Sequence, residues 1–360
     1  MRLVVFGLTI SSSWGNGHAT LWRGLVAALA RRGVSVTFFE KDQHWYAGNR
    51  DYWDLPGGQL VLYRDWAEVL PRARRQVAEA DAAMVTSYCP DGVAATELVR
   101  DGRALRLFYD LDTPVTLAEL EAGRSPDYLA PDGLAGFDLV FSYTGGRALE
   151  ALRDRLGAQA VAPLYGHVDP AVHRPVPPQD HYRADLSYLG TYAADRQPGV
   201  ERFLVEPARL LPEKRFVIGG AQYPQDFPWT DNIWFVRHLP PPEHPAFFSS
   251  SRLTLNVTRA AMAAMGWCPS GRLFEAASCG VPVFSDGWEG LDRFFTPGVD
   301  ILVGRRTEDA VAALSLSDAE LRRMGEAARA RVLADHTADV RADEFLAALS
   351  AARAPQRRSA

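Results

Sequence analysis

The side chains whose types and spacing are most typical of a ligand-binding site lie in residues 269–286, PSGRLFEAASCGVPVFSD. Arg272 and Glu275 lie three residues apart, which is one turn of a helix, just inside a predicted helix start. We predict that Ser270 caps this helix and that Gly280 ends it in the left-handed conformation. An arginine at a helix start suits a diphosphate, and a carboxylate one turn on can accept both hydroxyls of a ribose. The alternative interpretation is a surface ion pair at (i, i+3).

Small or cationic residues follow several other apolar runs of the second half. Because parallel strands end at one edge of a sheet, these residues are predicted to converge there and to bind a nucleotide diphosphate without a metal. With Arg272 and Glu275, the predicted donor-binding residues are Gly190, Thr191, Arg196, Gly219, Gly220, Asn256, Arg259, Ser270 and Gly271.

The first half opens with a strand followed by the loop SSSWGNGHATLW, in which Gly15 and Gly17 allow close backbone approach to a ligand. The loop lacks the dinucleotide fingerprint G-x-G-x-x-G, because Thr20 occupies the third glycine position. Glu40 nevertheless lies about where an NAD-binding domain has its ribose-binding acid. An NAD-dependent oxidoreductase is therefore the first alternative.

Three residues of the first half are predicted to do acid–base work or to bind an acceptor. His18 can deprotonate a hydroxyl or can simply cap or pack at a helix start. Asp110 and Asp112 can bind a divalent ion, but without further ligands the metal-free interpretation is favoured, in which they cap the next helix or bind a polar acceptor. The predicted acceptor-binding residues are Trp14, Gly15, Asn16, Gly17 and Asp110, and the predicted catalytic ones are His18, Asp112 and Arg272. An aromatic platform for the acceptor, or alternatively core packing, is predicted for Trp14, Trp45, Tyr46 and Trp53.

Alternating apolar runs and amphipathic stretches must position these residues. Strands are predicted at 59–63, 82–86, 104–109, 138–142 and 160–164 after a β-α-β opening, and a second alternating series begins at DLSYLG. The stretch 165–183, rich in proline and histidine, separates the two series. This pattern predicts an α/β protein of two Rossmann-like domains, each with a parallel sheet, that face one another across a cleft.

Composition narrows the class of protein. The chain has 360 residues, 47% hydrophobic and 23% charged, which is typical of a folded enzyme of two domains. The net charge of −5 disfavours a nucleic-acid partner, and no apolar run is long enough to cross a bilayer. Three cysteines without metal-site or disulfide spacing favour a cytoplasmic location. The sequence leaves the oligomeric state open.

Several segments together resemble the CgeB-like family of GT-B glycosyltransferases. The resemblance rests on DLSYLGTYAADR (185–196), RFVIGG (215–220), LTLNVTR (253–259), residues 269–286, HTADVR (336–341) and, less strongly, 137–175. It implies an acceptor domain at 1–170, a donor domain at 171–336, a helix at 337–352 that packs back on the first domain, and a tail at 353–360. It also implies that the stretch around His238 contacts the nucleotide base.

The resemblance implies a glycosyltransferase that moves a sugar from a nucleoside diphosphate sugar to a hydroxyl acceptor, with retention and without a metal or other cofactor. Many retaining relatives carry a second glutamate eight residues before the ribose-binding one, where this chain has Trp267. This departure leaves the sugar and the stereochemistry open. The second alternative is a non-catalytic relative that only binds a sugar nucleotide or a partner protein.

Overall fold

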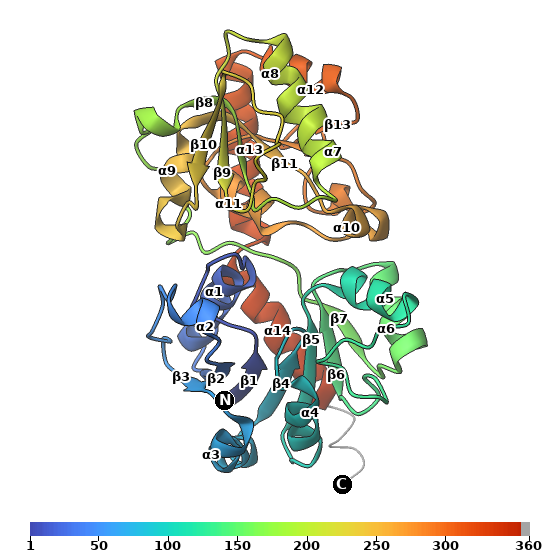
Figure 1. Ribbon diagram of the computed structural model, residues 1–360. Coiled ribbons are helices and arrows are strands. Elements are labelled where there is room, and N and C mark those ends of the chain that lie inside the picture. The colour runs from blue at the N-terminus through green and yellow to red at the C-terminus, as the bar shows by residue number, and fades with distance from the viewer. Residues whose placement is uncertain (354–360) are drawn as a thin grey trace. The chain divides into compact units, whose positions relative to one another are not determined.

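The computed structural model describes residues 1–353, and most of the predicted tail lies outside them (Figure 1). The chain forms two compact units. Unit 1 is Met1–Tyr165 together with the chain from Ala338 onward, and unit 2 is Gly166–Thr337. Each is built on one parallel sheet, so the predicted α/β class with two Rossmann-like domains is confirmed.

Unit 1 contains a seven-stranded parallel sheet in the order β3-β2-β1-β4-β5-β6-β7. The strands are β1 (Arg2–Gly7), β2 (Ser35–Lys41), β3 (Gln59–Tyr63), β4 (Ala82–Thr86), β5 (Leu105–Asp110), β6 (Leu139–Ser142) and β7 (Val161–Pro163). They agree with the predicted strands to within one or two residues, because each is a short apolar run that a parallel sheet buries on both faces.

Helices cover both faces of this sheet (Figure 1). They are α1 (His18–Arg31), α2 (His44–Ala47), α3 (Trp66–Ala78), α4 (Gly92–Arg100), α5 (Thr113–Glu121), α6 (Arg147–Leu156) and α14 (Ala338–Arg353). Successive β1 residues point to opposite faces, so Leu3 and Val5 pack with α1 and α14, whereas Val4 and Phe6 pack with α3 and α4. The last helix of the described chain therefore belongs to the core of unit 1.

Unit 2 repeats the strand order with six parallel strands, β10-β9-β8-β11-β12-β13. They are β8 (Ala184–Leu189), β9 (Phe216–Gly220), β10 (Ile233–Arg237), β11 (Ser251–Asn256), β12 (Val283–Asp286) and β13 (Leu302–Gly304). The helices are α7 (Gln197–Val200), α8 (Glu206–Leu210), α9 (His244–Ser249), α10 (Ala260–Met265), α11 (Gly271–Ser278), α12 (Thr307–Leu314) and α13 (Asp318–Asp335), with a π-helical turn at Glu201–Val205 that joins α7 to α8.

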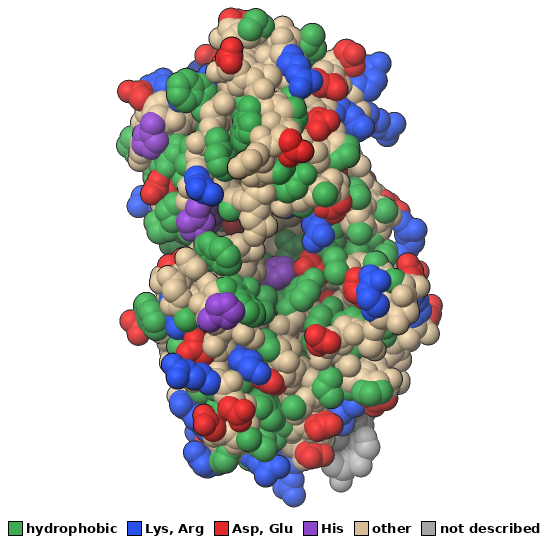
Figure 2. Space-filling view, viewed as in Figure 1, with side chains coloured by type: hydrophobic (Ala, Val, Ile, Leu, Met, Phe, Trp, Pro, Cys, Tyr) green, Lys and Arg blue, Asp and Glu red, His purple; other side chains and the backbone are tan. Residues whose placement is uncertain are grey.

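The charges on the surface, the lengths of the helices and the state of the cysteines can be compared with what the composition indicated. Figure 2 shows acidic and basic side chains interspersed over the viewed face of each unit. Within residues 1–353, no helix is both long enough and apolar enough to span a bilayer. Cys89, Cys268 and Cys279 are all buried free thiols.

Candidate functional site

Arg272 lies at the point in unit 2 where the strand order reverses, between β8 and β11. Open α/β sheets bind ligands at this reversal, beyond the carboxyl ends of the strands. The Arg272 guanidinium donates through Nε to the carbonyl oxygen of Leu189, the last residue of β8, and through Nη1 to Oδ1 of Asn256, the last residue of β11, at 2.8 Å. It also lies over the ring of Tyr188, 5.0 Å from the centroid. Both strand ends therefore fix this cation in place.

The charges of Arg272 and Glu275 are not neutralised by one another. No ion pair within 4.0 Å involves either side chain in residues 1–353, so the interpretation as an (i, i+3) surface ion pair is wrong. Burial lowers the pKa of Arg272 and raises the pKa of Glu275, because it disfavours both charged forms. The hydrogen bonds of Arg272 go to neutral oxygens, which leaves its positive charge available to an anion.

The loops that follow β8, β9 and β10 pack backbone against backbone beside Arg272. The Gly190 amide donates to the Gly219 carbonyl at 2.8 Å, and the His238 amide donates to the Gly220 carbonyl at 2.8 Å. A Cβ on Gly220 would lie 2.1 Å from the Gly190 carbonyl oxygen, so only glycine fits there. His238 has φ +51°, an uncommon conformation for a non-glycine residue. The predicted glycines thus allow three loops to meet at one edge of the sheet.

Two capping details were predicted for α11, and one of them is confirmed. Gly280 has φ +78° and ends the helix in the left-handed conformation, as predicted. Ser270 occupies the N-cap position, but its side chain makes no capping hydrogen bond, so the predicted side-chain cap is wrong. A backbone bond of 3.0 Å from the Leu273 amide to the Ser270 carbonyl closes the first turn instead.

Other predicted donor residues lie around this edge with their own partners. Nη2 of Arg196 donates to the Thr191 carbonyl at 2.8 Å, while its buried Nε has no partner in the described chain. Arg259 is half exposed and pairs with Asp195 at 3.1 Å. Asn256 is fully buried, and its Nδ2 donates to Oγ of Ser285 at 2.9 Å. This burial gives Asn256 the role of positioning Arg272.

In unit 1, His18 and Asp112 meet at the corresponding edge. His18 is the first residue of α1, and its Nε2 lies 3.7 Å from Oδ2 of Asp112, with both side chains partly exposed. The Tyr88 hydroxyl donates to the same Asp112 oxygen at 2.9 Å, and the Tyr88 ring stacks on His18 with centroids 6.1 Å apart. His18 follows β1 and Tyr88 follows β4, the two strands at the strand reversal of unit 1, and Asp112 follows β5, the neighbour of β4.

Asp110 lies beneath this group. It is fully buried, and its Oδ1 accepts from Oγ1 of Thr116 at 3.0 Å and from the Asp112 amide at 3.3 Å. Its Oδ2 has no partner in the described chain, and burial raises the pKa of Asp110 to about 6. Asp112 occupies the N-cap position of α5 but makes no side-chain cap, because its carboxylate accepts from Tyr88 instead.

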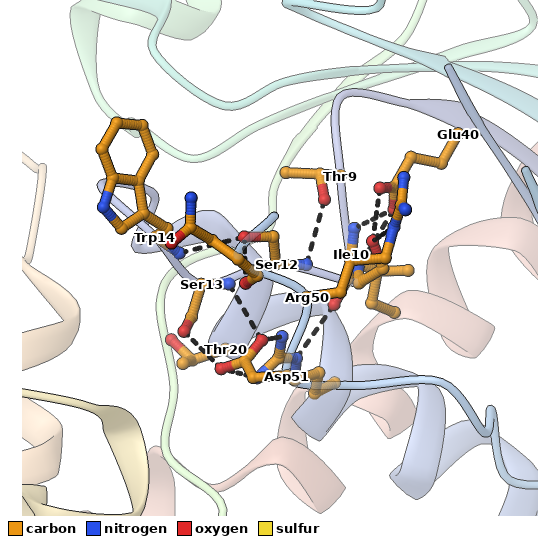
Figure 3. A network of polar contacts seen from close by, with 12 residues as sticks. Thr9, Ile10, Ser12, Ser13, Trp14, Thr20, Glu40, Arg50 and Asp51 are labelled. Carbon is orange, nitrogen blue, oxygen red and sulfur yellow. Dashed lines mark hydrogen bonds and ion pairs between the residues drawn. The ribbon is translucent and has the colours of Figure 1, made fainter. Parts of the chain in front are cut away.

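A polar network fixes the loop that precedes α1, as Figure 3 shows. Glu40 is fully buried and accepts hydrogen bonds from the Ile10 amide at 2.8 Å, the Ser11 amide at 3.0 Å and the Ser11 hydroxyl at 2.5 Å. Since Glu40 anchors the loop and has no exposed surface, its interpretation as the ribose-binding acid of an NAD domain is wrong.

Four of the predicted acceptor residues, Trp14, Gly15, Asn16 and Gly17, lie on this loop. The fifth, Asp110, ends β5 and has no exposed surface with which to contact an acceptor. Trp14 points away from the Glu40 network in Figure 3. Gly15 and Gly17 are exposed, and Oδ1 of the nearly buried Asn16 accepts from the His18 amide at 3.0 Å. Of the other aromatic candidates, Tyr46 is buried, whereas Trp45 and Trp53 are among the exposed large hydrophobic residues.

Two site residues were not predicted from the sequence: Tyr88, which contacts His18, and Tyr188, which contacts Arg272. Their only sequence signal was their place at the ends of apolar runs, and a tyrosine there is as typical of a core. Trp267, in the predicted position of a second glutamate, has φ +52°, and its ring packs so closely that a Cβ on Gly290 would lie 2.5 Å from it.

Comparisons with known proteins agree with the observed fold. A sequence-family model described as "Glycosyl transferase-like" matches residues 196–347. No curated protein sequence matches the chain. Among solved structures, sucrose-phosphate synthase from Thermosynechococcus elongatus superposes with a TM-score of 0.73 at 16% identity, over 96% of this chain and 97% of that one. The fold is that of the GT-B glycosyltransferases.

Two further structures with the same fold are similar at low sequence identity. HepE from Anabaena in complex with UDP-glucose has a TM-score of 0.67 at 13% identity, over 98% of this chain and 100% of that one. A glycosyltransferase from Rickettsia africae has a TM-score of 0.66 at 10% identity, over 98% of each chain. The GT-B part of the resemblance is therefore confirmed, and the CgeB-like assignment stays a prediction.

Proposed function

We propose that this protein is a retaining, metal-independent glycosyltransferase that moves a sugar from a nucleoside diphosphate sugar to a hydroxyl acceptor. The observation that carries the proposal is the pair Arg272 and Glu275. They are opposite charges one helical turn apart at the strand reversal of unit 2, and neither forms an ion pair within the described chain. A ligand with an anionic part and a hydroxyl-bearing part satisfies both, as a diphosphate joined to a ribose does.

In this proposal Arg272 holds the diphosphate and stabilises the negative charge that develops as the sugar leaves. Arg196, whose buried Nε has no partner in the described chain, is a second cation for the phosphates. Glu275 accepts the ribose hydroxyls, and the stretch around His238 contacts the base. Because the HepE structure contains UDP-glucose, a uridine donor is the first to test.

The acceptor is proposed to bind at unit 1, near His18 and Asp112. In a retaining transfer, the bond from the sugar carbon to the phosphate oxygen breaks, the acceptor oxygen bonds to that carbon on the same face, and the leaving phosphate takes the acceptor's proton. His18 and Asp112 then orient the acceptor hydroxyl. The contact of 3.7 Å between them also fits an inverting transfer, in which His18 removes the proton and Asp112 stabilises the imidazolium.

Calorimetry with UDP, GDP and NAD in the presence of EDTA tests the donor site. We expect one nucleoside diphosphate to bind the wild type and to bind Arg272→Ala and Glu275→Ala much more weakly. Tight binding of NAD alone would support an oxidoreductase and contradict the proposal.

Product analysis tests the transfer itself. Incubation with a panel of labelled UDP- and GDP-sugars should give hydrolysis or transfer without added metal, and NMR of the anomeric carbon should show retention. An inverted product would assign His18 as the base. Nucleotide binding without turnover of any donor would instead support the non-catalytic alternative.

A further inference from the structure

A second group of polar side chains, distinct from the Arg272 contacts, surrounds the carboxylate of Glu275. One ligand atom each from His173, His244 and Glu275 lies within 4.8 Å of the other two. His173 belongs to the segment before β8, His244 is the first residue of α9, and Glu275 is on α11. The hydroxyl of Ser278, one turn after Glu275, donates to the His173 carbonyl at 2.6 Å and ties that segment to α11.

His173 is buried, His244 and Glu275 are partly buried, and a ring nitrogen of each histidine lacks a partner in the described chain. Nε2 of His173 and Nδ1 of His244 are inaccessible to solvent and have no hydrogen-bond partner in residues 1–353. His173 is 4% exposed. Nε2 of His244 contacts the Leu239 carbonyl at 3.3 Å, which leaves Nδ1 as its remaining ring nitrogen. Buried polar atoms without partners are rare, because each costs the free energy of its lost hydration. Two such ring nitrogens beside one carboxylate indicate a common ligand.

The donor atoms of the group favour a cation. A neutral imidazole has a lone pair on one ring nitrogen, and in His244 that nitrogen is Nδ1, because Nε2 contacts a carbonyl oxygen. The Glu275 carboxylate is the only acid of the group. Two neutral imidazoles and one carboxylate match a donor set that binds Zn²⁺, whereas Mg²⁺ and Ca²⁺ prefer oxygen ligands.

We propose that His173, His244 and Glu275 form a binding site for a divalent transition-metal ion, with Zn²⁺ the best fit and water as the fourth ligand. A small inward movement of the side chains brings their ligand atoms to the distances of tetrahedral zinc, about 2.0–2.2 Å from the ion. Glu275 is partly exposed, which provides a route for entry.

The site has a regulatory consequence that rests on the function proposed above. If the Glu275 carboxylate binds the donor ribose, one carboxylate serves both ligands, and the metal and the nucleotide exclude one another. The ion then inhibits a transferase that needs no metal for chemistry. Metal binding itself does not depend on that function.

Calorimetric titration of the EDTA-stripped, full-length protein with Zn²⁺ tests the site directly, and the visible absorption of Co²⁺ reports tetrahedral nitrogen and oxygen ligation. We expect one ion per chain in the wild type. His173→Gln and His244→Gln should weaken binding by more than the 10- to 100-fold that the loss of a supporting second-shell partner costs. His181→Gln, which changes an exposed histidine outside the group, should bind as the wild type does.

Two further measurements keep the result interpretable. His244→Cys supplies a thiolate ligand and should retain Zn²⁺, and thermal melting checks that every variant folds. Unchanged zinc affinity in both glutamine variants, or no saturable binding to the wild type, would overturn the proposal. Zinc binding that UDP and GDP do not weaken would confirm the metal site and contradict the ribose role of Glu275, whereas nucleotide binding without zinc binding would leave the proposed function standing.

Discussion

The two strand reversals of this chain have the same topology and different chemistry. In unit 1 the order reverses between β1 and β4, where His18, Tyr88 and Asp112 contact one another. In unit 2 it reverses between β8 and β11, where Arg272 bonds to the ends of both strands. The first site brings together an imidazole, a phenol and a carboxylate, and the second presents a positive charge held by neutral oxygens.

The difference shows that the parallel sheet determines where functional side chains gather, while the residues at the strand ends determine what they bind. In the proposed function, the side chains of unit 1 orient an acceptor hydroxyl, and those of unit 2 bind the diphosphate. A substitution at the unit 1 site that weakens donor binding would contradict this division. So would a substitution of Arg272 in unit 2 that leaves donor binding unchanged.

The largest effect is expected for Arg272→Ala. Loss of a preorganised cation should lower the transfer rate by about 10²- to 10³-fold and should also weaken nucleotide binding. Arg272→Lys should recover only part of the activity, because a compact ammonium lacks the planar fork of N–H groups with which Arg272 donates to Leu189 and Asn256. Steady-state kinetics and UDP calorimetry measure both effects. Arg305→Ala, which removes an exposed arginine of unit 2, is the control and should be unchanged.

Glu275→Gln should have the next largest effect. A neutral amide replaces charge-assisted hydrogen bonds to the ribose, each worth about 1.5–3 kcal/mol, so nucleotide affinity should fall by about 10- to 100-fold. Binding of inorganic pyrophosphate, which lacks a ribose, should be nearly unchanged. An equal loss for both ligands would assign Glu275 to the structure of the site. Glu308→Gln in α12 is the matched exposed control.

His18→Ala tests the same comparison at the site in unit 1. In a retaining transfer, His18 only orients the acceptor, so kcat/KM for the acceptor should fall about tenfold while the dissociation constant for UDP stays constant. A loss of about 10²- to 10⁴-fold in kcat would instead identify His18 as a general base. His44→Ala, at an exposed histidine of unit 1, controls for surface effects.

The last prediction concerns stability rather than activity and involves Asp110. Its folded-state pKa of about 6 lies above its ordinary value of 3.8, so between these values the native state binds more protons than the unfolded state. Stability of unit 1 should therefore fall as pH rises from about 4 to above 6, by up to about 3 kcal/mol at about 1.4 kcal/mol per pKa unit. Hydrogen exchange of β5 amides measures this. Asp110→Asn should remove this contribution to the slope, and an equal slope in the variant would refute the assignment.

Much of the architecture was predictable because its signal is local. The strands of unit 1 appear as short apolar runs, and Gly280 ends α11 in the conformation that only glycine adopts readily. Boundaries were less predictable in unit 2, where the apolar run 281–285 becomes a strand only from Val283. Strand ends depend on pairing with a neighbour, which the run of residues does not specify.

The candidate sites were predictable only in part. Arg272, Glu275, His18 and Asp112 stood out because their residue types and positions after apolar runs are typical of ligand contacts. Glu40 had an equally good pattern, but its burial against the Ser11 loop gave it a structural role. A pattern identifies a side chain that can bind, whereas its exposure and partners decide whether it is available.

By itself, the sequence determined two parallel α/β units and the helix that carries Arg272 and Glu275, since periodicity and turn residues act over a few positions. Only the tertiary structure decided that these two charges do not pair, and that His173 and His244 lie beside Glu275. Those contacts join residues about 30 to 100 positions apart in the chain. They depend on how loops and helices pack on the sheet, and no local pattern encodes that packing.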